Sequence, residues 1–189
     1  MAERVIPYTK IAAWLHWGVA ILILVNLTLA WVADSLPDGW IRPGIDLHKS
    51  IGLTVLGLVL LRILWRIAHP PPKLPDSYGP WEQLGAHAAH YALYVLILAL
   101  PVTGWLHDSA FKDAAAHPLR LFWVIPWFRV SAVADLAPAA KEVAHSQLYA
   151  LHAASGYALY TLLALHIAGA LKHQWEGHPE LQRMRVGRV

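Results

Sequence analysis

An apolar run from Leu148 to Leu171 that carries two histidines constrains the fold more than any other stretch of the chain. His152 and His166 are fourteen residues apart, which at about 100° per residue is nearly four full helical turns, so both rings lie on one helix face. At about 1.5 Å per residue they are separated by roughly 21 Å, enough to put one near each surface of a hydrocarbon layer. Because buried imidazole nitrogens without ligands or hydrogen bonds are unfavourable, the rest of the chain must supply partners for both rings.

The amino-acid composition indicates whether the chain folds in water or in a membrane. Of the 189 residues, 57% are hydrophobic and only 14% are charged, whereas a soluble domain has about 25% charged residues. This predicts a membrane protein. The net charge of +3 is small and the basic residues lie at the ends of apolar segments, which does not indicate a nucleic-acid partner. The absence of cysteine excludes disulfides, thiolate metal sites, iron–sulfur clusters and covalent c-type haem, so any iron must be held by histidine.

Four apolar segments are long enough to cross a bilayer, and polar or proline-containing stretches separate them. The expected helices cover residues 11–33, 47–67, 84–106 and 147–171. The first has no Ala-x-Ala exit and is expected to remain as a helix rather than to be cleaved as a signal peptide. Residues 34–46 are expected to form a loop, and 107–146 a long outer loop. The predicted fold class is all-α, a four-transmembrane-helix bundle forming a single domain over residues 1–189, with the lipid bilayer as its first partner.

The long outer loop contains an aromatic segment, residues 119–130, that is too short to span and is interrupted by proline. We expect it to lie in the membrane interface. Four spans place both termini on one side, where nine Lys and Arg residues gather against six on the other, four of which are in the long loop. Long loops count less in this balance, so a multi-pass protein with both termini cytoplasmic is predicted. The nine are Arg4, Lys10, Arg62, Arg66, Lys73, Lys172, Arg183, Arg185 and Arg188.

Depth along the predicted helices sorts the histidines into pairs. His16 and His166 each lie a short distance inside the cytoplasmic end of a helix, whereas His48 and His152 lie near the outer ends. Two histidines from separate helices at one level can hold a planar macrocycle by both axial positions. The residue four positions after each is small, which leaves room for a flat ring against the helix. These small residues are Ala20, Gly52, Gly156 and Ala170.

These histidines also have simpler interpretations. A single histidine in a membrane helix can simply hydrogen bond to a neighbouring helix. Zinc commonly takes an acidic or cysteine ligand among its four, and the predicted spans contain neither, so two histidines per level fit haem better. His87 and His90 are expected to make interhelical or propionate hydrogen bonds. Arg62 and Arg66 are either plain snorkelling charges or charges that balance a propionate or a semiquinone. Six further histidines are expected at interfaces or in loops: His69, His107, His117, His145, His173 and His178.

Several stretches resemble one family over nearly the whole chain. They are Leu15-His16-Trp17, Leu47-His48-Lys49-Ser50-Ile51-Gly52, Leu61-Arg62-Ile63-Leu64-Trp65-Arg66, Ala89-His90-Tyr91-Ala92-Leu93-Tyr94, Leu151-His152, Leu165-His166 and Leu171-Lys172-His173. Together they look like the bacterial cytochrome b561 family, di-haem four-helix proteins related to the cytochrome b subunits of hydrogenases and formate dehydrogenases. The resemblance implies two haem b groups between the helices, with His16 paired to His166 and His48 paired to His152 as axial ligands of the iron. The 107–146 loop is long for the family, and nothing in it can be carried over from the resemblance.

Three functions remain open from the sequence. The first is electron transfer across the bacterial inner membrane to or from the quinone pool, as the resemblance implies. Some relatives are similar to superoxide oxidases that reduce ubiquinone, and Lys49 with Arg42 would then attract the anion, unless both are ordinary loop charges. The second is a non-catalytic anchor and relay subunit for a partner dehydrogenase or a periplasmic redox protein, with residues 119–130 as the docking surface. The third is a structural bundle without a cofactor. Whether the protein is an enzyme or a carrier is left open.

Overall fold

The computed structural model describes residues 6–74, 77–178 and 180–186. Arg4 and Arg188, two of the basic residues counted above, lie outside the described residues. The elements in chain order are α1 (Lys10–Val32), the short 3₁₀ helix η1 (Ala33–Ser35), α2 (Asp38–Ala68), α3 (Pro80–Ser109), β1 (Arg120–Leu121), β2 (Ile125–Pro126), α4 (Ser131–Ala134), α5 (Pro138–Trp175) and α6 (Glu180–Arg183).

Within the described chain, α1, α2, α3 and α5 are long and apolar enough to cross a membrane. Large apolar side chains such as Leu64, Tyr91 and Tyr157 are exposed along these helices, as expected for a surface that faces lipid instead of water. The four-helix membrane bundle predicted from the sequence is confirmed.

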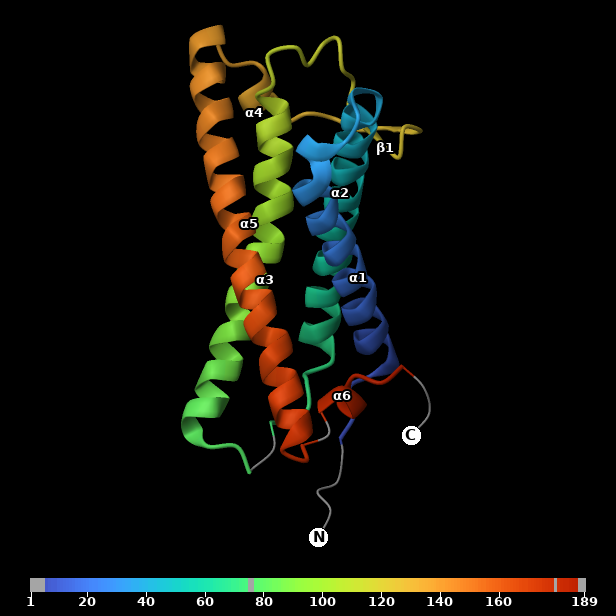
Figure 1. Cartoon of the computed structure of the whole chain (residues 1–189), viewed down its shortest axis with the longest axis vertical. Helices are drawn as coiled ribbons and strands as arrows, with labels where there is room; N and C mark the ends of the chain where they lie inside the picture. The colour runs from blue at the N-terminus through green and yellow to red at the C-terminus, as the bar shows by residue number, and fades with distance from the viewer. Residues whose placement is uncertain (1–5, 75–76, 179, 187–189) are drawn as a thin grey trace.

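The helices form two pairs, α1 beside α2 and α3 beside α5, and α2 also packs on α3 (Figure 1). A core of buried apolar residues fills the middle of the bundle: Val19, Ile51, Val55, Val59, Ile97 and Leu159. Helices α1 and α5 meet through side chains: the Tyr160 hydroxyl donates to the Leu27 carbonyl at 3.0 Å, and the Tyr160 and Trp31 rings make an edge contact. These contacts place α5 beside α1 as well as beside α3.

The expected loop at residues 34–46 is wrong in most of its length, because α2 begins at Asp38 and includes Pro43. An ion pair between Arg42 and Asp46, at 3.2 Å and one turn apart, supports this first part of the helix. Gly44 therefore lies inside a helix and not in a turn. A Cβ at this position would lie 2.8 Å from the Leu36 side chain, so the glycine allows that side chain to pack closely on the helix.

Helices α3 and α5 both start with proline at their first position and are longer than expected, so the long connection shrinks to residues 110–137. It contains a two-stranded hairpin in which Arg120 pairs with Pro126 and Leu121 with Ile125. Two hydrogen bonds fix this connection to the bundle: Phe122 N–H donates to Ser50 Oγ at 2.9 Å, and Val130 N–H donates to Ser109 Oγ at 3.0 Å. We call the end of the bundle that carries this connection the outer end.

The opposite, inner end is closed by α6 (Figure 1). Arg183 is buried, pairs with Glu180 at 3.1 Å, and donates through Nη2 to the carbonyls of Pro72 and Lys73. Its own carbonyl accepts the Tyr8 N–H at 2.9 Å. A residue expected to be part of a basic tail is thus the centre of a contact that joins the two ends of the described chain to the turn between α2 and α3.

Candidate functional site

The structure brings the predicted histidines together at two levels. At the outer level, the ring centres of His48 on α2 and His152 on α5 are 6.2 Å apart, with the planes at 84°. At the inner level, the ring centres of His16 on α1 and His166 on α5 are 6.4 Å apart, with the planes at 71°. Helix α5 contributes one histidine to each level, because fourteen residues of helix return its side chains to one face.

The ring separations can be compared with those of two imidazoles that bind one metal ion from opposite sides. Two imidazoles on opposite sides of one metal ion have ring centres about 6 Å apart, from two metal–nitrogen bonds of about 2 Å and about 1 Å from each nitrogen to its ring centre. The observed 6.2 and 6.4 Å agree with this value. Both pairs therefore fit a metal centre held between two histidines.

Hydrogen bonds at the outer pair also orient the two rings for binding a metal ion. His48 Nδ1 lies 3.2 Å from the Asn26 carbonyl oxygen, and His152 Nδ1 lies 3.0 Å from the Leu100 carbonyl oxygen. A carbonyl can only accept, so each Nδ1 carries the proton and each Nε2 keeps a free lone pair. Metal-binding histidines are characteristically held by such bonds from the second ring nitrogen.

A cavity of about 160 Å³ adjoins the outer pair, and its wall consists of the two histidines with Leu29, Ala30, Ala33, Gly44 and Ile45. These small and aliphatic side chains suit a flat apolar ring. Of the small residues expected beside the histidines, Gly156 faces open space, whereas a Cβ at Gly52 would make an ordinary 3.6 Å contact with Asn26 Nδ2.

Gly104 on α3 is part of the outer site, and sequence reasoning missed it. A Cβ at this position would lie 3.0 Å from Cε1 and 3.3 Å from Nδ1 of the His152 ring, so the ring could keep its place against α3 only by shifting a few tenths of an ångström. The sequence offers no signal for this role, because a single glycine in an apolar helix has no periodicity that connects it to a histidine 48 residues away.

The inner pair has a different environment. His90 joins it, with its ring centre 5.5 Å from that of His166, whereas His87 turns away and its Nδ1 contacts the Gln83 carbonyl of its own helix at 2.7 Å. His16 Nδ1 is buried and has no hydrogen-bond partner among the residues that the structure describes. The carbonyl bonds that orient both rings of the outer pair are therefore not repeated at His16.

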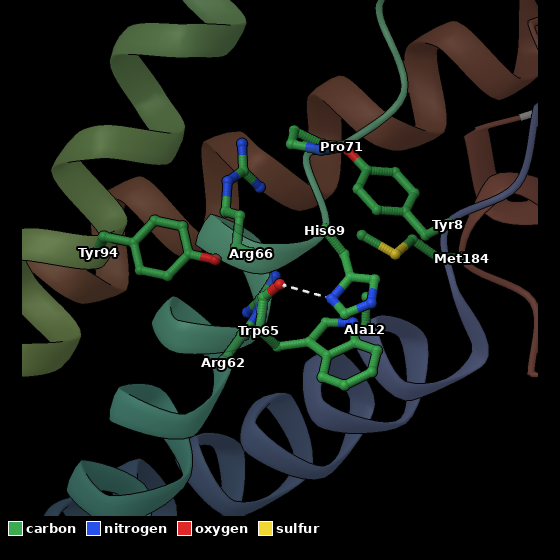
Figure 2. Close-up of a pocket in the computed structure, with 9 residues that line it drawn as sticks. All are labelled: Tyr8, Ala12, Arg62, Trp65, Arg66, His69, Pro71, Tyr94 and Met184. Atoms are coloured by element: carbon green, nitrogen blue, oxygen red, sulfur yellow. Dashed lines mark hydrogen bonds between the residues drawn. The ribbon is translucent and has the colours of Figure 1, made fainter.

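Two arginines of α2 lie in a pocket at the inner end (Figure 2). The guanidinium carbons of Arg62 and Arg66 are 5.3 and 5.7 Å from the centre of the Tyr94 ring, and the Tyr94 hydroxyl is buried without a hydrogen-bond partner. Within residues 6–74, 77–178 and 180–186, neither guanidinium has a carboxylate at ion-pair distance. Half-buried cations need a counter-charge, so this pocket is suited to an anionic group such as a haem propionate.

The two outer cations named for attracting superoxide, Lys49 and Arg42, are already paired. Lys49 lies 2.6 Å from the buried carboxylate of Asp108, which also binds Arg129 at 3.0 Å, and Arg42 is held by Asp46. The sequence placed Asp108 in a loop and missed this network. Lys49 and Arg42 therefore do not form the free positive patch that the superoxide hypothesis used.

Comparison with known proteins decides the family. The family model for prokaryotic cytochrome b561 matches residues 7–187. The chain belongs to the prokaryotic cytochrome b561 family. Among its relatives, the chain is 33% identical to "Cytochrome b561 homolog 2" of Escherichia coli K12, over 96% of this chain and 92% of the relative. It is 26% identical to "Probable superoxide oxidase CybB" of Yersinia pestis, over 89% of each chain, and 30% identical to "Cytochrome b562" of Cereibacter sphaeroides, over 68% of this chain and 85% of the relative.

Family membership and the four apolar helices establish the general activity. The protein is a bacterial membrane electron-transfer cytochrome of the b561 type, and its cofactor is b-type haem. The histidine pairs, the outer cavity and the arginine pocket are the parts of the chain that fit such a cofactor.

Proposed function

We propose that the protein binds two b haems and passes electrons between them across the bacterial inner membrane, in exchange with the ubiquinone pool. One haem is held by His16 and His166, and the other by His48 and His152. The observation that carries this proposal is the convergence of the two pairs, with ring centres 6.4 and 6.2 Å apart, at two levels of one helix. Residues 1–189 act as a single domain, with both termini cytoplasmic.

Held between two imidazoles, a b haem supplies reversible one-electron transfer at an iron without an open position for oxygen. The chain's own residues hold it and control its surroundings. The Asn26 and Leu100 carbonyls keep the outer Nδ1 atoms protonated, so that Nε2 can bind the metal. Buried apolar side chains such as Val55, Val59 and Leu159 keep water out of the region between the levels. Arg62 and Arg66, in the inner pocket, would hold the propionates of the inner haem.

The source of the electrons is the open part of this proposal. A relative named as a probable superoxide oxidase supports superoxide as a donor at the outer end, although its identity is only 26%. The pairing of Lys49 with Asp108 removes one physical argument for superoxide steering. We therefore propose quinone exchange as the general activity and superoxide oxidation as the form of it to be tested.

A relay subunit is the second candidate, and one observation favours it. The tip of the hairpin presents apolar side chains to the surroundings at Phe122, Trp123, Val124 and Ile125. Such a surface suits either the membrane interface or a periplasmic redox partner. Quinol oxidation by the isolated protein would favour the first function, whereas reduction only through an added partner would favour the relay.

The first experiment is a haem-to-protein ratio with oxidised and reduced visible spectra of detergent-purified protein, followed by addition of a quinol analogue. We expect two low-spin b haems that the quinol reduces. His152→Ala should lose the outer haem and His166→Ala the inner one, whereas His87→Ala, the matched control, should keep both. Loss of neither haem from a folded variant would contradict the assigned pairs.

A further inference from the structure

The tip of the outer hairpin, residues 122–125, lies outside the proposed haem sites. Its four side chains are apolar and exposed, and Val124 is 74% exposed. We propose that this tip is a preformed anchor that inserts into the headgroup region of the lipid bilayer at the outer end. The proposal does not depend on the haem sites.

The backbone of the tip adopts a conformation that residues of its type rarely take. Phe122 and Trp123 have φ values of 48° and 64°, and the Val124 N–H closes the turn by donating to the Leu121 carbonyl at 3.0 Å. Positive φ at the central positions of a hairpin turn normally selects asparagine or glycine, because a larger side chain is strained there. Two bulky aromatic residues therefore occupy positions that disfavour them, and such strain is typical of segments with a function.

Contacts at the base of the hairpin hold it in this shape. Leu119, next to β1, is buried, and its carbonyl accepts the Trp127 N–H at 2.9 Å. The Trp105 indole of α3 donates to the Phe128 carbonyl at 2.9 Å, and the two rings make an edge contact. The base is packed on the bundle while the side chains of the tip are exposed, so the tip is ordered before it meets a partner.

The position of the tip along α2 indicates what surrounds it. The Phe122 N–H donates to Ser50 Oγ at 2.9 Å. Ser50 marks a boundary on α2, because the ion-paired Asp46 and Lys49 precede it and no charged residue follows until Arg62. In a helix that crosses a membrane, the change from charged to apolar residues occurs where the headgroups meet the hydrocarbon. The tip therefore lies at the level of the membrane interface.

The direction of the hairpin favours lipid over a soluble partner. The hairpin extends sideways from α2, whereas residues 110–118 arch over the outer end and α5 reaches beyond the hairpin (Figure 1). A soluble protein that approaches the outer end would meet this arch and the start of α5 first. In a membrane, the space beside α2 at this level is filled by lipid.

The chemistry of the hairpin matches the two layers of the interface. The Trp123 ring combines an apolar surface with one N–H donor, which suits the boundary between acyl chains and headgroups. Arg120, exposed on β1, can extend its guanidinium to lipid phosphates. Two further tryptophans are exposed near the outer end, Trp31 on α1 and Trp40 on α2. The tip thus adds a third segment to an aromatic belt at this surface.

Spin labelling of the full-length holoprotein, in nanodiscs of phosphatidylcholine and phosphatidylglycerol, tests the location of the tip. The chain has no cysteine, so Val124→Cys carries a single nitroxide. Electron paramagnetic resonance with power saturation compares its collisions with oxygen, which concentrates in lipid, and with a nickel chelate, which stays in water. The oxygen-to-nickel ratio at Val124→Cys should exceed that at Lys112→Cys, exposed in the arch, at least about threefold. Tyr157→Cys, exposed on α5 between the two histidine levels, gives the value for lipid.

A double substitution separates the aromatic side chains from the shape of the turn. Phe122→Asn combined with Trp123→Gly suits the positive φ values, so the hairpin keeps its turn and loses both rings. The ratio measured at Val124→Cys should then fall at least about threefold, toward the value at Lys112→Cys.

The possible outcomes are distinct. A ratio at Val124→Cys equal to that at Lys112→Cys would overturn the proposal, because the tip would then face water and be free for a soluble partner. An unchanged ratio in the variant with Phe122→Asn and Trp123→Gly would overturn the anchoring role of the aromatic pair. Haem content is measured in parallel for every variant, so failure of the proposed haem sites is distinguishable from a tip that faces water.

Discussion

At the scale of single residues, the environment of each histidine separates ligand candidates from ordinary polar side chains. Nδ1 of His48 and of His152 contacts a backbone carbonyl of a neighbouring helix, so both rings are fixed from outside their own helices. His87, in contrast, contacts only the carbonyl of Gln83, one turn earlier on its own helix. Sequence spacing distinguished the pairs by depth, but only the contacts show which rings are held in place.

Gly104 provides the sharpest test of how closely the outer site is packed. In Gly104→Ala, the new Cβ would lie 3.0 Å from His152 Cε1, so the ring must move away from α3. We expect a lower outer-haem content or an altered spectrum of that haem, measured by the haem-to-protein ratio and low-temperature visible spectroscopy. Gly57→Ala is the matched control, because nothing lies within 4 Å of its Cβ, and it should be neutral or stabilising by about 0.5–1 kcal/mol. An unchanged outer haem in Gly104→Ala would contradict the close packing of the His152 ring on α3.

Substitution of Arg62 should change the midpoint potential of the inner haem alone. Replacing it by glutamine removes a cation that stabilises electron uptake, so the inner midpoint potential should fall by about 59 mV, which corresponds to a tenfold change in a one-electron equilibrium. Potentiometric titration of both haems measures the shift. Arg62→Lys should restore most of it, and Lys73→Gln, an exposed cation at the same end, should cause none. Equal shifts of both potentials would argue against an arginine site specific to the inner haem.

At the scale of elements, the predictable and unpredictable parts have different physical origins. The four spans and the pairing of His16 with His166 follow from apolar length and helical rise, which are local properties of the chain. The start of α2 at Asp38 depends on Leu36 packing against Gly44, and the outer connection depends on Ser50 and Ser109. Such contacts between side chains and distant backbone leave no periodic signal, so local turn propensity gave the wrong loop boundary.

The inner turn and α6 give a prediction for pH dependence. Tyr78 is buried and its hydroxyl donates to Glu180 at 2.8 Å. Burial, and then this hydrogen bond, raise the pKa of Tyr78 above its ordinary value of 10. Because the pKa of Tyr78 is higher in the folded than in the unfolded state, its protonated hydroxyl contributes fully to the free energy of unfolding below about pH 10. This contribution is lost as the pH rises above that value.

Tyr78→Phe should therefore be less stable near pH 8, by about 1 kcal/mol for the lost hydrogen bond, and its stability should fall less steeply above pH 10. Thermal unfolding in detergent between pH 8 and pH 11 measures both effects. The control is Tyr157→Phe, at an exposed position on α5. Parallel pH profiles for the unaltered protein and Tyr78→Phe would contradict the assignment of this alkaline transition to Tyr78.

At the scale of the whole molecule, the two ends of the bundle are closed in different ways, and this determines how its orientation can be tested. The inner end is closed by α6 and Arg183, and the outer end by the 110–137 connection. We propose that the inner end is cytoplasmic.

Because the chain contains no cysteine, a single introduced cysteine reports its own side of the membrane without background. The cells are treated so that the outer membrane is permeable and the inner membrane stays intact. A membrane-impermeant maleimide should then label Lys112→Cys, an exposed position of the outer connection, at once. It should label Lys73→Cys, exposed in the inner turn, only after lysis. The reverse labelling pattern would place the arginine pocket on the periplasmic side. Electrons from a periplasmic donor would then enter at His16 and His166 instead of at His48 and His152.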